Sequence, residues 1–88
     1  MHEAKQWTVS LDIDEHDGRT RAVARLHTRD SDSLVGVGLA RLNPADADIP
    51  EIGDELAVAR ALAELHHKLL DCVADDLEHA GETAPQSP

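Results

Sequence analysis

The chain has 88 residues, of which 41% are hydrophobic, and it carries a formal net charge of −10. This length makes one domain with one thin core and excludes a second domain. With one Trp, no Phe and no Tyr, the core must be aliphatic, and forming a dimer would add burial that so small a monomer lacks.

The charge is unevenly distributed along the chain. Residues 1–42 hold seven acids and six bases, whereas residues 43–88 hold eleven acids and only two bases, Arg60 and Lys68. An acidic second half repels polyanions, which excludes nucleic acid bound mainly through that half. The single Cys72 excludes an intramolecular disulfide, and no signal-peptide segment or apolar run of 18 residues is present. We therefore expect a soluble cytoplasmic protein with no membrane segment.

The first predicted element is a β-hairpin. Residues 7–14 alternate apolar and polar side chains, which is the period of a half-buried strand, and Trp7 is expected at the rim of the core. Asp17-Gly18 predicts a two-residue turn, because both residues tolerate positive φ. In the register set by this turn, apolar residues meet apolar ones and an acid meets an arginine. The predicted pairs are His16–Arg19, Asp14–Arg21, Ser10–Arg25, Ile13–Ala22, Leu11–Ala24 and Val9–Leu26.

The third predicted strand, residues 34–42, is apolar on both faces. Its glycines, Gly36 and Gly38, lie on one face, and the larger side chains of Val35, Val37 and Leu39 lie on the other. We expect the larger side chains to lie under a helix. The glycine face is then expected to contact the backbone of a partner or to contain a bulge. The reason is that glycine weakens a strand unless another group approaches the strand closely at that point.

A long amphipathic helix is predicted after a connection rich in proline and aspartate, residues 43–50. It opens at residues 53–55 with Asp54 or a neighbour as the N-cap, and it ends at His79 before Gly81. Its apolar stripe recurs at steps of three or four residues: Val58, Leu62, Leu65, Leu69, Val73 and Leu77. A helix of roughly 39 Å is longer than the sheet, so its far end must overhang, bend or pack on another subunit. Residues 1–5 are expected to be flexible, 6–80 to form the domain and 81–88 to be a disordered tail.

Three blocks of the sequence resemble a known family. They are Gln6-Trp7-Thr8-Val9 with Ile13-Asp14-Glu15-His16, then Val35 to Asp46, then Pro50 to Leu56 with Ala59-Arg60-Ala61-Leu62. Together they resemble a small actinobacterial domain of unknown function with a double-stranded-RNA-binding-domain-like (dsRBD-like) fold. The resemblance implies an α+β fold, with a three-stranded antiparallel sheet followed by a C-terminal helix packed on one face. It also implies homodimers, a link to stress and dormancy, and a shape similar to that of ribosome hibernation-promoting factors, whose helices are basic where this one is acidic.

Five arginines form the candidate binding surface: Arg19, Arg21, Arg25, Arg29 and Arg41. The predicted register places the first three on the solvent face with His27, where they are able to meet phosphates or an acidic protein. The alternative is that they pair with Asp12, Asp14 and neighbouring acids and only keep the sheet soluble.

No catalytic, cofactor or metal motif is predicted. His66-His67 with Asp71 offers ligands one turn apart on the helix, but no further ligand converges there, so a solvated helix face is favoured. His16, among carboxylates at the hairpin tip, fits turn chemistry, and Cys72 is expected in the core.

These features predict a non-enzymatic protein of stress or dormancy that contacts the ribosome or structured RNA through its arginines. We expect a homodimer that binds no cofactor, DNA or membrane. The alternative is a protein-interaction module whose acidic helix binds a basic partner. An enzyme would need a convergent set of polar groups, which the sequence does not show.

Overall fold

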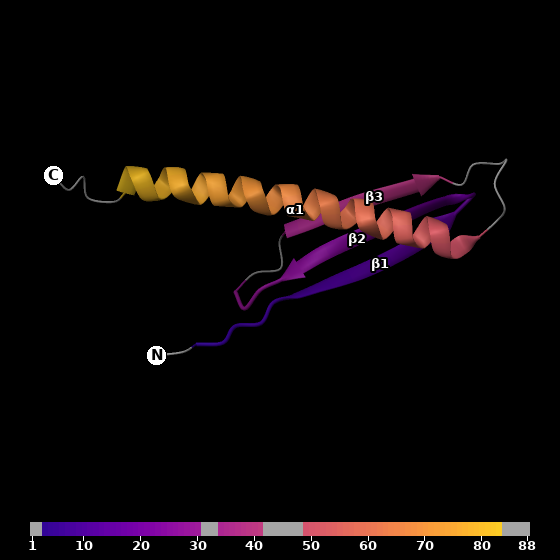
Figure 1. Ribbon diagram of the computed structural model, residues 1–88, viewed down its shortest axis with the longest axis horizontal. Coiled ribbons are helices and arrows are strands. Elements are labelled where there is room, and N and C mark those ends of the chain that lie inside the picture. The colour runs from indigo at the N-terminus through magenta and orange to yellow at the C-terminus, as the bar shows by residue number, and fades with distance from the viewer. Residues whose placement is uncertain (1–2, 31–33, 42–48, 84–88) are drawn as a thin grey trace.

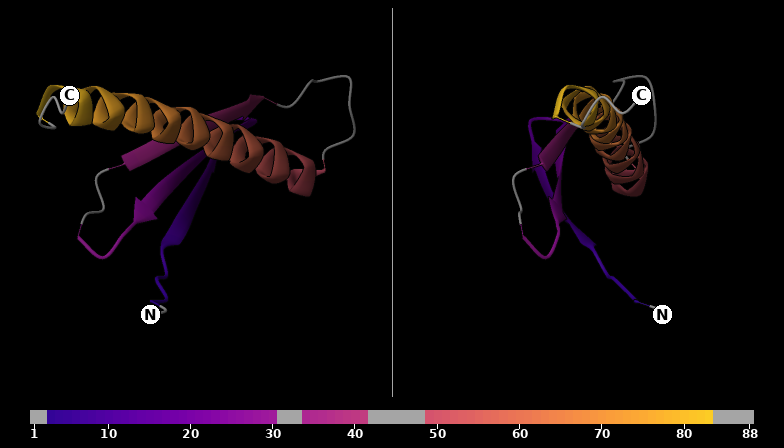
Figure 2. Two further views of the ribbon diagram at one scale, coloured as in Figure 1. Left: turned by 60° about the vertical axis from the view of Figure 1, so that its left-hand side comes forward. Right: turned by 90° about the vertical axis from the view of Figure 1, so that its left-hand side faces the viewer.

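The structure is a computed structural model that describes residues 3–30, 34–41 and 49–83. Its elements are strands β1 (Thr8–His16), β2 (Arg19–His27) and β3 (Leu34–Arg41) and helix α1 (Pro50–Thr83). The strands form an antiparallel sheet in the order β1-β2-β3, and α1 crosses one side of it (Figure 1). No described element covers the other side, here called the open face (Figure 2). The predicted α+β class and order of elements are confirmed.

The hairpin has the predicted turn and register. Asp17 and Gly18 have φ values of 51° and 73°, as a type I′ turn requires, and this turn matches the twist of the strands. All six predicted cross-strand pairs are present. The apolar side chains of β1 therefore share the helix side of the sheet with Ala22, Ala24 and Leu26, and the polar side chains share the open face.

Helix α1 packs on the glycine face of β3. A Cβ atom on Gly38 would collide with backbone atoms of Ala57 and Ala61, and one on Gly36 would lie 2.6 Å from the backbone nitrogen of Leu65. Real Cβ atoms do not approach other atoms that closely. Glycine is thus required at both positions because the helix backbone lies directly against the strand.

The prediction that Val35, Val37 and Leu39 lie under the helix is wrong. These side chains lie on the open face, where Leu39 is 61% exposed and the two valines are half-buried. A strand that is apolar on both faces has no polar side chains to mark its solvent side. The glycines marked the covered face, because they are the residues that permit close approach.

The helix face on the sheet consists of residues four apart: Ala57, Ala61 and Leu65. The two alanines are fully buried and Leu65 is 3% exposed, with Val58 and Leu69 packed beside them. The rest of the predicted stripe is exposed: Leu62, Val73 and Leu77. The stripe is therefore only partly right, because close contact with β3 selects the smallest helix residues rather than the most hydrophobic ones.

Helix α1 is longer than predicted at both ends. It begins at Pro50 rather than beside an Asp54 cap, since the fixed φ of proline suits the first helical turn. It passes through Gly81, which lacks the positive φ of a glycine C-cap, and ends at Thr83. The predicted stop at Gly81 is therefore wrong. Of the tail predicted to be disordered, residues 81–88, the first three belong to α1. Residues 84–88 and most of the predicted 43–50 connection lie outside the described residues.

The second half of α1 extends beyond the sheet (Figure 1). Its 34 residues span about 51 Å, and residues 70–81 are all exposed. This is the overhang that the sequence predicted among its alternatives. In the part of the chain that the structure describes, no helix is long and apolar enough to cross a membrane.

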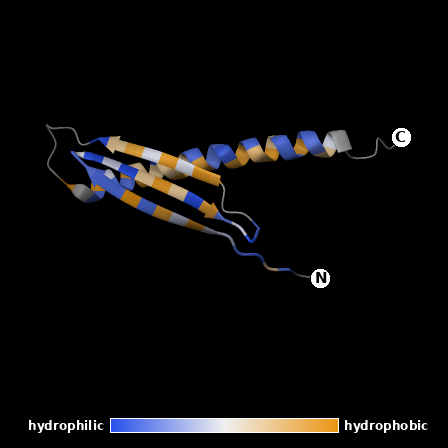
Figure 3. Cartoon of the chain, turned by 180° about the vertical axis from the view of Figure 1, so that it is seen from behind, coloured by the Kyte–Doolittle hydropathy of each residue, from blue (hydrophilic) through white to orange (hydrophobic). Residues whose placement is uncertain are grey.

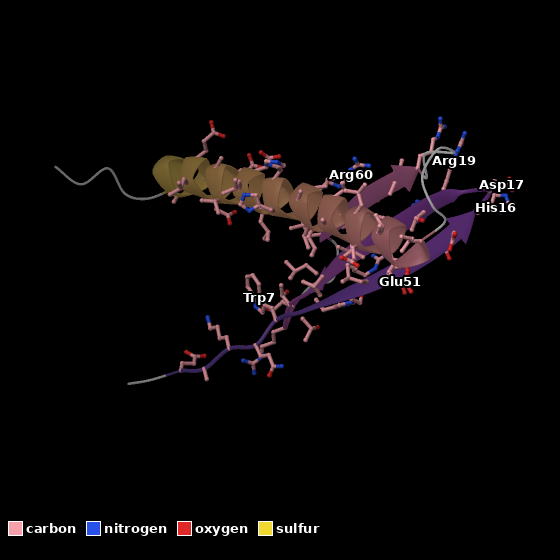
Figure 4. The ribbon with its side chains drawn as sticks, turned by 45° about the vertical axis from the view of Figure 1, so that its right-hand side comes forward. Trp7, His16, Asp17, Arg19, Glu51 and Arg60 are labelled. Carbon is pink, nitrogen blue, oxygen red and sulfur yellow. The ribbon has the colours of Figure 1, made fainter. Side chains whose placement is uncertain are left out.

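Three helix side chains, one turn apart, bind the outer backbone edge of β3. Arg60 Nη1 donates to Leu39 O (2.6 Å), Val37 N donates to Glu64 Oε2 (3.1 Å), and Lys68 Nζ donates to Val35 O (2.6 Å). Glu64 and Lys68 also form an ion pair of 3.2 Å. We call these three side chains the β3 cap; Figure 4 shows Arg60 on the flank of α1 toward β3. The cap occupies an edge that would otherwise be free to pair with another strand.

The cap makes one contribution to stability depend on pH. The Val37 N–H, followed by the hydrogen bond and charge of Lys68, lowers the pKa of Glu64 below its ordinary value. Because folding lowers its pKa, the Glu64 carboxylate stabilises the fold at pH values above its unfolded-state pKa. This stabilisation is lost as the pH falls through the folded-state pKa. We expect Glu64→Gln to be less stable than the wild type at neutral pH, and the difference to disappear as the pH falls through the folded-state pKa of Glu64. Urea unfolding at several pH values tests this, and a difference that persists unchanged into acid would contradict it.

Candidate nucleic-acid interface

The open face consists of three columns of side chains, one from each strand. Hydrophobic and hydrophilic residues alternate along β1 and β2, whereas β3 is mostly hydrophobic (Figure 3). From the register, β1 contributes Thr8, Ser10, Asp12, Asp14 and His16; β2 contributes Arg19, Arg21, Val23, Arg25 and His27; and β3 contributes Val35, Val37, Leu39 and Arg41. The central column is therefore cationic, with a polar column on one side and an apolar one on the other.

Four of the five candidate arginines lie on this face. Arg19 and Arg41 are direct cross-strand partners near the hairpin end, and Arg21 and Arg25 continue along β2. All are exposed except Arg25, which is half-buried. From Arg19 to Arg25 the column is about 20 Å long. Arg29 is exposed and follows the other end of β2, so it extends the line of the column.

Among the residues that the structure describes, no ion pair joins an acid to an arginine of the open face. Within the described residues, the ion pairs shorter than 4.0 Å are His16–Asp17 and Lys68–Glu64. Asp14 lies opposite Arg21 in the register, yet no ion pair joins them. The alternative in which these arginines serve mainly as partners for Asp12 and Asp14 thus has no ion pair to support it. Arg19, Arg21 and Arg41 are exposed to solvent, and Arg25 is half-buried.

A hollow of about 590 Å³ adjoins this column at the end of the sheet opposite the hairpin. It is lined by residues 3–8 and 27–30, including the cations Lys5 and Arg29 and the indole of Trp7. Trp7 is 56% exposed and lies far from Arg19 along the sheet (Figure 4). The sequence predicted Trp7 at the rim of the core; in the structure Trp7 lines this hollow and is more exposed than buried. The lining also contains the carboxylates Glu3 and Asp30. A half-exposed indole in a hollow with Lys5 and Arg29 is suited to stack on a nucleobase while the cations meet phosphates.

The side chain of Ser10 hydrogen-bonds to His27 on the open face, with 2.9 Å between Oγ and Nε2. A nucleophilic serine also needs a group that orients its histidine and donors for an oxyanion. In the described residues no carboxylate contacts this ring. The pair is therefore a cross-strand polar contact that holds the imidazole beside the hollow.

The other candidates from the sequence lie apart from this face. The rings of His66 and His67 are 5.3 Å apart and tilted by 51°, and the described residues hold no cluster of three potential metal ligands. Cys72 is exposed rather than in the core as predicted, because it lies on the overhang. His16 Nε2 is 3.2 Å from Asp17 Oδ2 in a nearly fully exposed turn.

Sequence reasoning missed the β3 cap. Its signal was present as charged residues at positions 60, 64 and 68, a spacing of four that places them on one flank of a helix. That flank lies beside the row of positions 57, 61 and 65 that packs on β3. The spacing predicts a shared flank, but only the packed structure shows a strand edge beside it.

This architecture defines a class of small α+β domains in which one long helix braces a three-stranded antiparallel sheet and leaves the other side of the sheet open. The chain belongs to the Rv2632c-like family, whose sequence model matches residues 5–86. It is 58% identical over 77 residues to the uncharacterized protein MT1780 of Mycobacterium tuberculosis (strain CDC 1551 / Oshkosh), covering 88% of this chain and 81% of that protein. It is 49% identical over 77 residues to the uncharacterized protein Rv2632c of Mycobacterium tuberculosis (strain ATCC 25618 / H37Rv), covering 88% and 82%.

The crystal structure of Rv2632c has the same fold. It superposes with a TM-score of 0.82 at 45% sequence identity, covering 99% of this chain and 98% of that one. These relatives are mycobacterial and uncharacterized. They agree with the predicted resemblance to a small actinobacterial family of unknown function.

Proposed function

We propose that this protein is a cytoplasmic, non-enzymatic binding protein that holds structured RNA against the open face of its sheet. The observation that carries the proposal is the separation of charge between the two sides. Among the described residues, Arg19, Arg21, Arg25 and Arg41 share the open face with two carboxylates, Asp12 and Asp14, while the acidic helix packs on the opposite side.

This separation reconciles RNA binding with a net charge of −10. Phosphates respond to the local potential of the surface they approach as well as to the net charge. A guanidinium group binds phosphate through two parallel hydrogen bonds, which suits the exposed arginines of β2. Trp7, Lys5 and Arg29 in the adjoining hollow add a stacking surface for an unpaired base.

The target proposed is ribosomal RNA, and the setting proposed is stress or dormancy. Both come from the resemblance of the sequence to a small actinobacterial family with a dsRBD-like fold, whose shape is similar to that of ribosome hibernation-promoting factors. Ribosomes are therefore one arm of the test below.

The test compares the wild type with Arg21→Ala/Arg25→Ala. We expect the wild type to bind a hairpin RNA and to co-sediment with ribosomes at low salt, with affinity falling steeply as salt rises. The double variant should bind more weakly and should have a salt slope smaller by about two, because each lost phosphate contact lowers it by about one. Fluorescence anisotropy gives the slope, and quenching of Trp7, the only Trp in a chain without Tyr or Phe, reports stacking.

Two controls make the result specific. Arg21→Lys/Arg25→Lys keeps the charge and should retain most of the salt slope, while a DNA duplex of the same sequence should bind less well than the RNA. Absence of RNA and ribosome binding by the wild type at low salt would refute the proposal.

The exposed overhang favours a second candidate, a protein-interaction module. Residues 70–81 are all exposed and include four acids: Asp71, Asp75, Asp76 and Glu78. Such an arm suits a basic protein partner. In the same assays, binding that survives loss of the arginines but is lost in Asp75→Asn/Asp76→Asn/Glu78→Gln would favour this candidate.

A further inference from the structure

The open face carries an apolar column directly beside its cationic one (Figure 3). This column consists of Val35, Val37 and Leu39 of β3. In the register of β2 with β3, Arg21 lies opposite Leu39 and Arg25 lies opposite Val35. The Cα atoms of such partners are about 4.5–5.5 Å apart, so each of these two arginines has an aliphatic neighbour. Leu39 is 61% exposed, and no described element covers the column.

The column on the other side of the arginines is acidic. Asp14 lies opposite Arg21, and Asp12 is the next residue along β1 whose side chain lies on this face. Both carboxylates are exposed. Their charge repels phosphate, whereas the aliphatic side chains of β3 carry no charge. A nucleic-acid backbone that follows the arginines is therefore held away from β1, and its bases extend over β3.

The spacing of the arginines fits an extended nucleic-acid strand. Arg19 and Arg21 are two residues apart, which is about 7 Å along β2, and Arg25 follows after about 14 Å. The backbone of an extended single strand advances by a similar distance with each nucleotide or pair of nucleotides. From Arg19 to His27 the column spans about 27 Å, which is long enough for about four nucleotides. At His27 the column reaches the hollow that Trp7 lines.

A duplex makes poorer use of this face. In duplex RNA the bases are paired and stacked, and proteins contact mainly phosphates and 2′-hydroxyl groups across the minor groove. A duplex would place these polar groups, rather than base faces, on the apolar column, and it would bring phosphates of its second strand toward Asp12 and Asp14. Domains that recognise duplex RNA by shape span about 16 base pairs, which is longer than this column of about 27 Å.

We propose that the open face binds an unpaired RNA strand, such as the loop of a hairpin, in preference to a duplex. The phosphates bind Arg19, Arg21 and Arg25, and the bases lie over Val37 and Leu39. The inference rests on the proposed RNA binding and narrows it to single-stranded segments. Aliphatic side chains offer no donors or acceptors to the base edges, so affinity depends on strand length and little on sequence.

Competition against a fluorescent hairpin RNA with a loop of uridines tests the preference with the wild-type protein alone. We expect oligouridylate and the unlabelled hairpin to displace the probe, and a blunt duplex of the stem sequence to compete at least about tenfold more weakly. Among oligouridylates, affinity should rise steeply up to about four nucleotides and slowly beyond that length. A blunt duplex that competes as well as the hairpin would overturn the inference and leave the proposed RNA binding standing. If no RNA binds, both are overturned.

Val37→Thr/Leu39→Thr tests the apolar column separately, because it removes apolar surface and keeps every charge. We expect the affinity for oligouridylate to fall at least about tenfold. The salt slope should stay unchanged, because no phosphate contact is lost, whereas loss of the arginines lowers that slope. Unchanged affinity in a variant whose circular dichroism matches the wild type would overturn the inference.

Leu70→Thr/Val73→Thr is the matched control for this variant. It makes the same exchange of one leucine and one valine on the overhang, where the two side chains are 52% and 53% exposed. We expect it to bind oligouridylate like the wild type, and an equal loss of affinity in both variants would count against the apolar column. The competition with the wild type decides the preference for unpaired RNA even if Val37→Thr/Leu39→Thr fails to fold.

Discussion

Gly38→Ala is expected to lower the melting temperature by at least about 12 °C. The added methyl group would collide with the backbone of Ala57 and Ala61, and a helix backbone cannot move aside as a flexible side chain can. Overpacking costs about 1–3 kcal/mol and more where backbone must shift. This cost is a large share of the total stability, because the free energy of unfolding for a chain of this length is on the order of 4–13 kcal/mol. Circular dichroism at a fixed protein concentration measures the change.

Gly81→Ala is the matched control, because it places the same methyl group in the same helix where no atom lies within 4 Å. Its melting temperature should be unchanged or slightly raised, since alanine favours helix over glycine. If Gly38→Ala melted within 2–3 °C of the wild type, roughly half a kilocalorie per mole or less, the close contact between α1 and β3 would be wrong.

Removal of the β3 cap is expected to make the protein form large assemblies. In Arg60→Ala/Glu64→Ala/Lys68→Ala, the backbone groups of Val35, Val37 and Leu39 lose their helix partners. The freed edge belongs to an apolar strand with an exposed leucine, which is a template for further strand pairing. Light scattering and thioflavin T fluorescence should both rise with time.

The charge of this triple variant makes the test stringent. It loses two cations and one anion, so it is more acidic than the wild type, and repulsion between chains opposes assembly. The control Asp71→Ala/Asp75→Ala/Glu78→Ala removes three charges from the overhang and should stay soluble. Equal solubility of both variants would show that the cap does not protect the edge.

The local features of the fold could be predicted from the sequence. The turn at Asp17-Gly18, the strand register and the arginine column follow from turn chemistry and a period of two, which act between residues near in sequence. The same holds for the existence of α1, because its alanines and spaced leucines favour helix over a long run.

What the sequence by itself determined was therefore the set of elements, their order, the hairpin register and the shared face of Arg19, Arg21 and Arg25. Tertiary structure alone decided which face of β3 lies under α1 and which residues of α1 touch the sheet. It also decided that Arg60, Glu64 and Lys68 occupy the outer edge of β3, while the outer edge of β1 stays open. The physical reason is that periodicity records how polar a face is, whereas these outcomes depend on how closely two backbones approach. Gly36 and Gly38 set that distance, and hydrophobicity does not measure it.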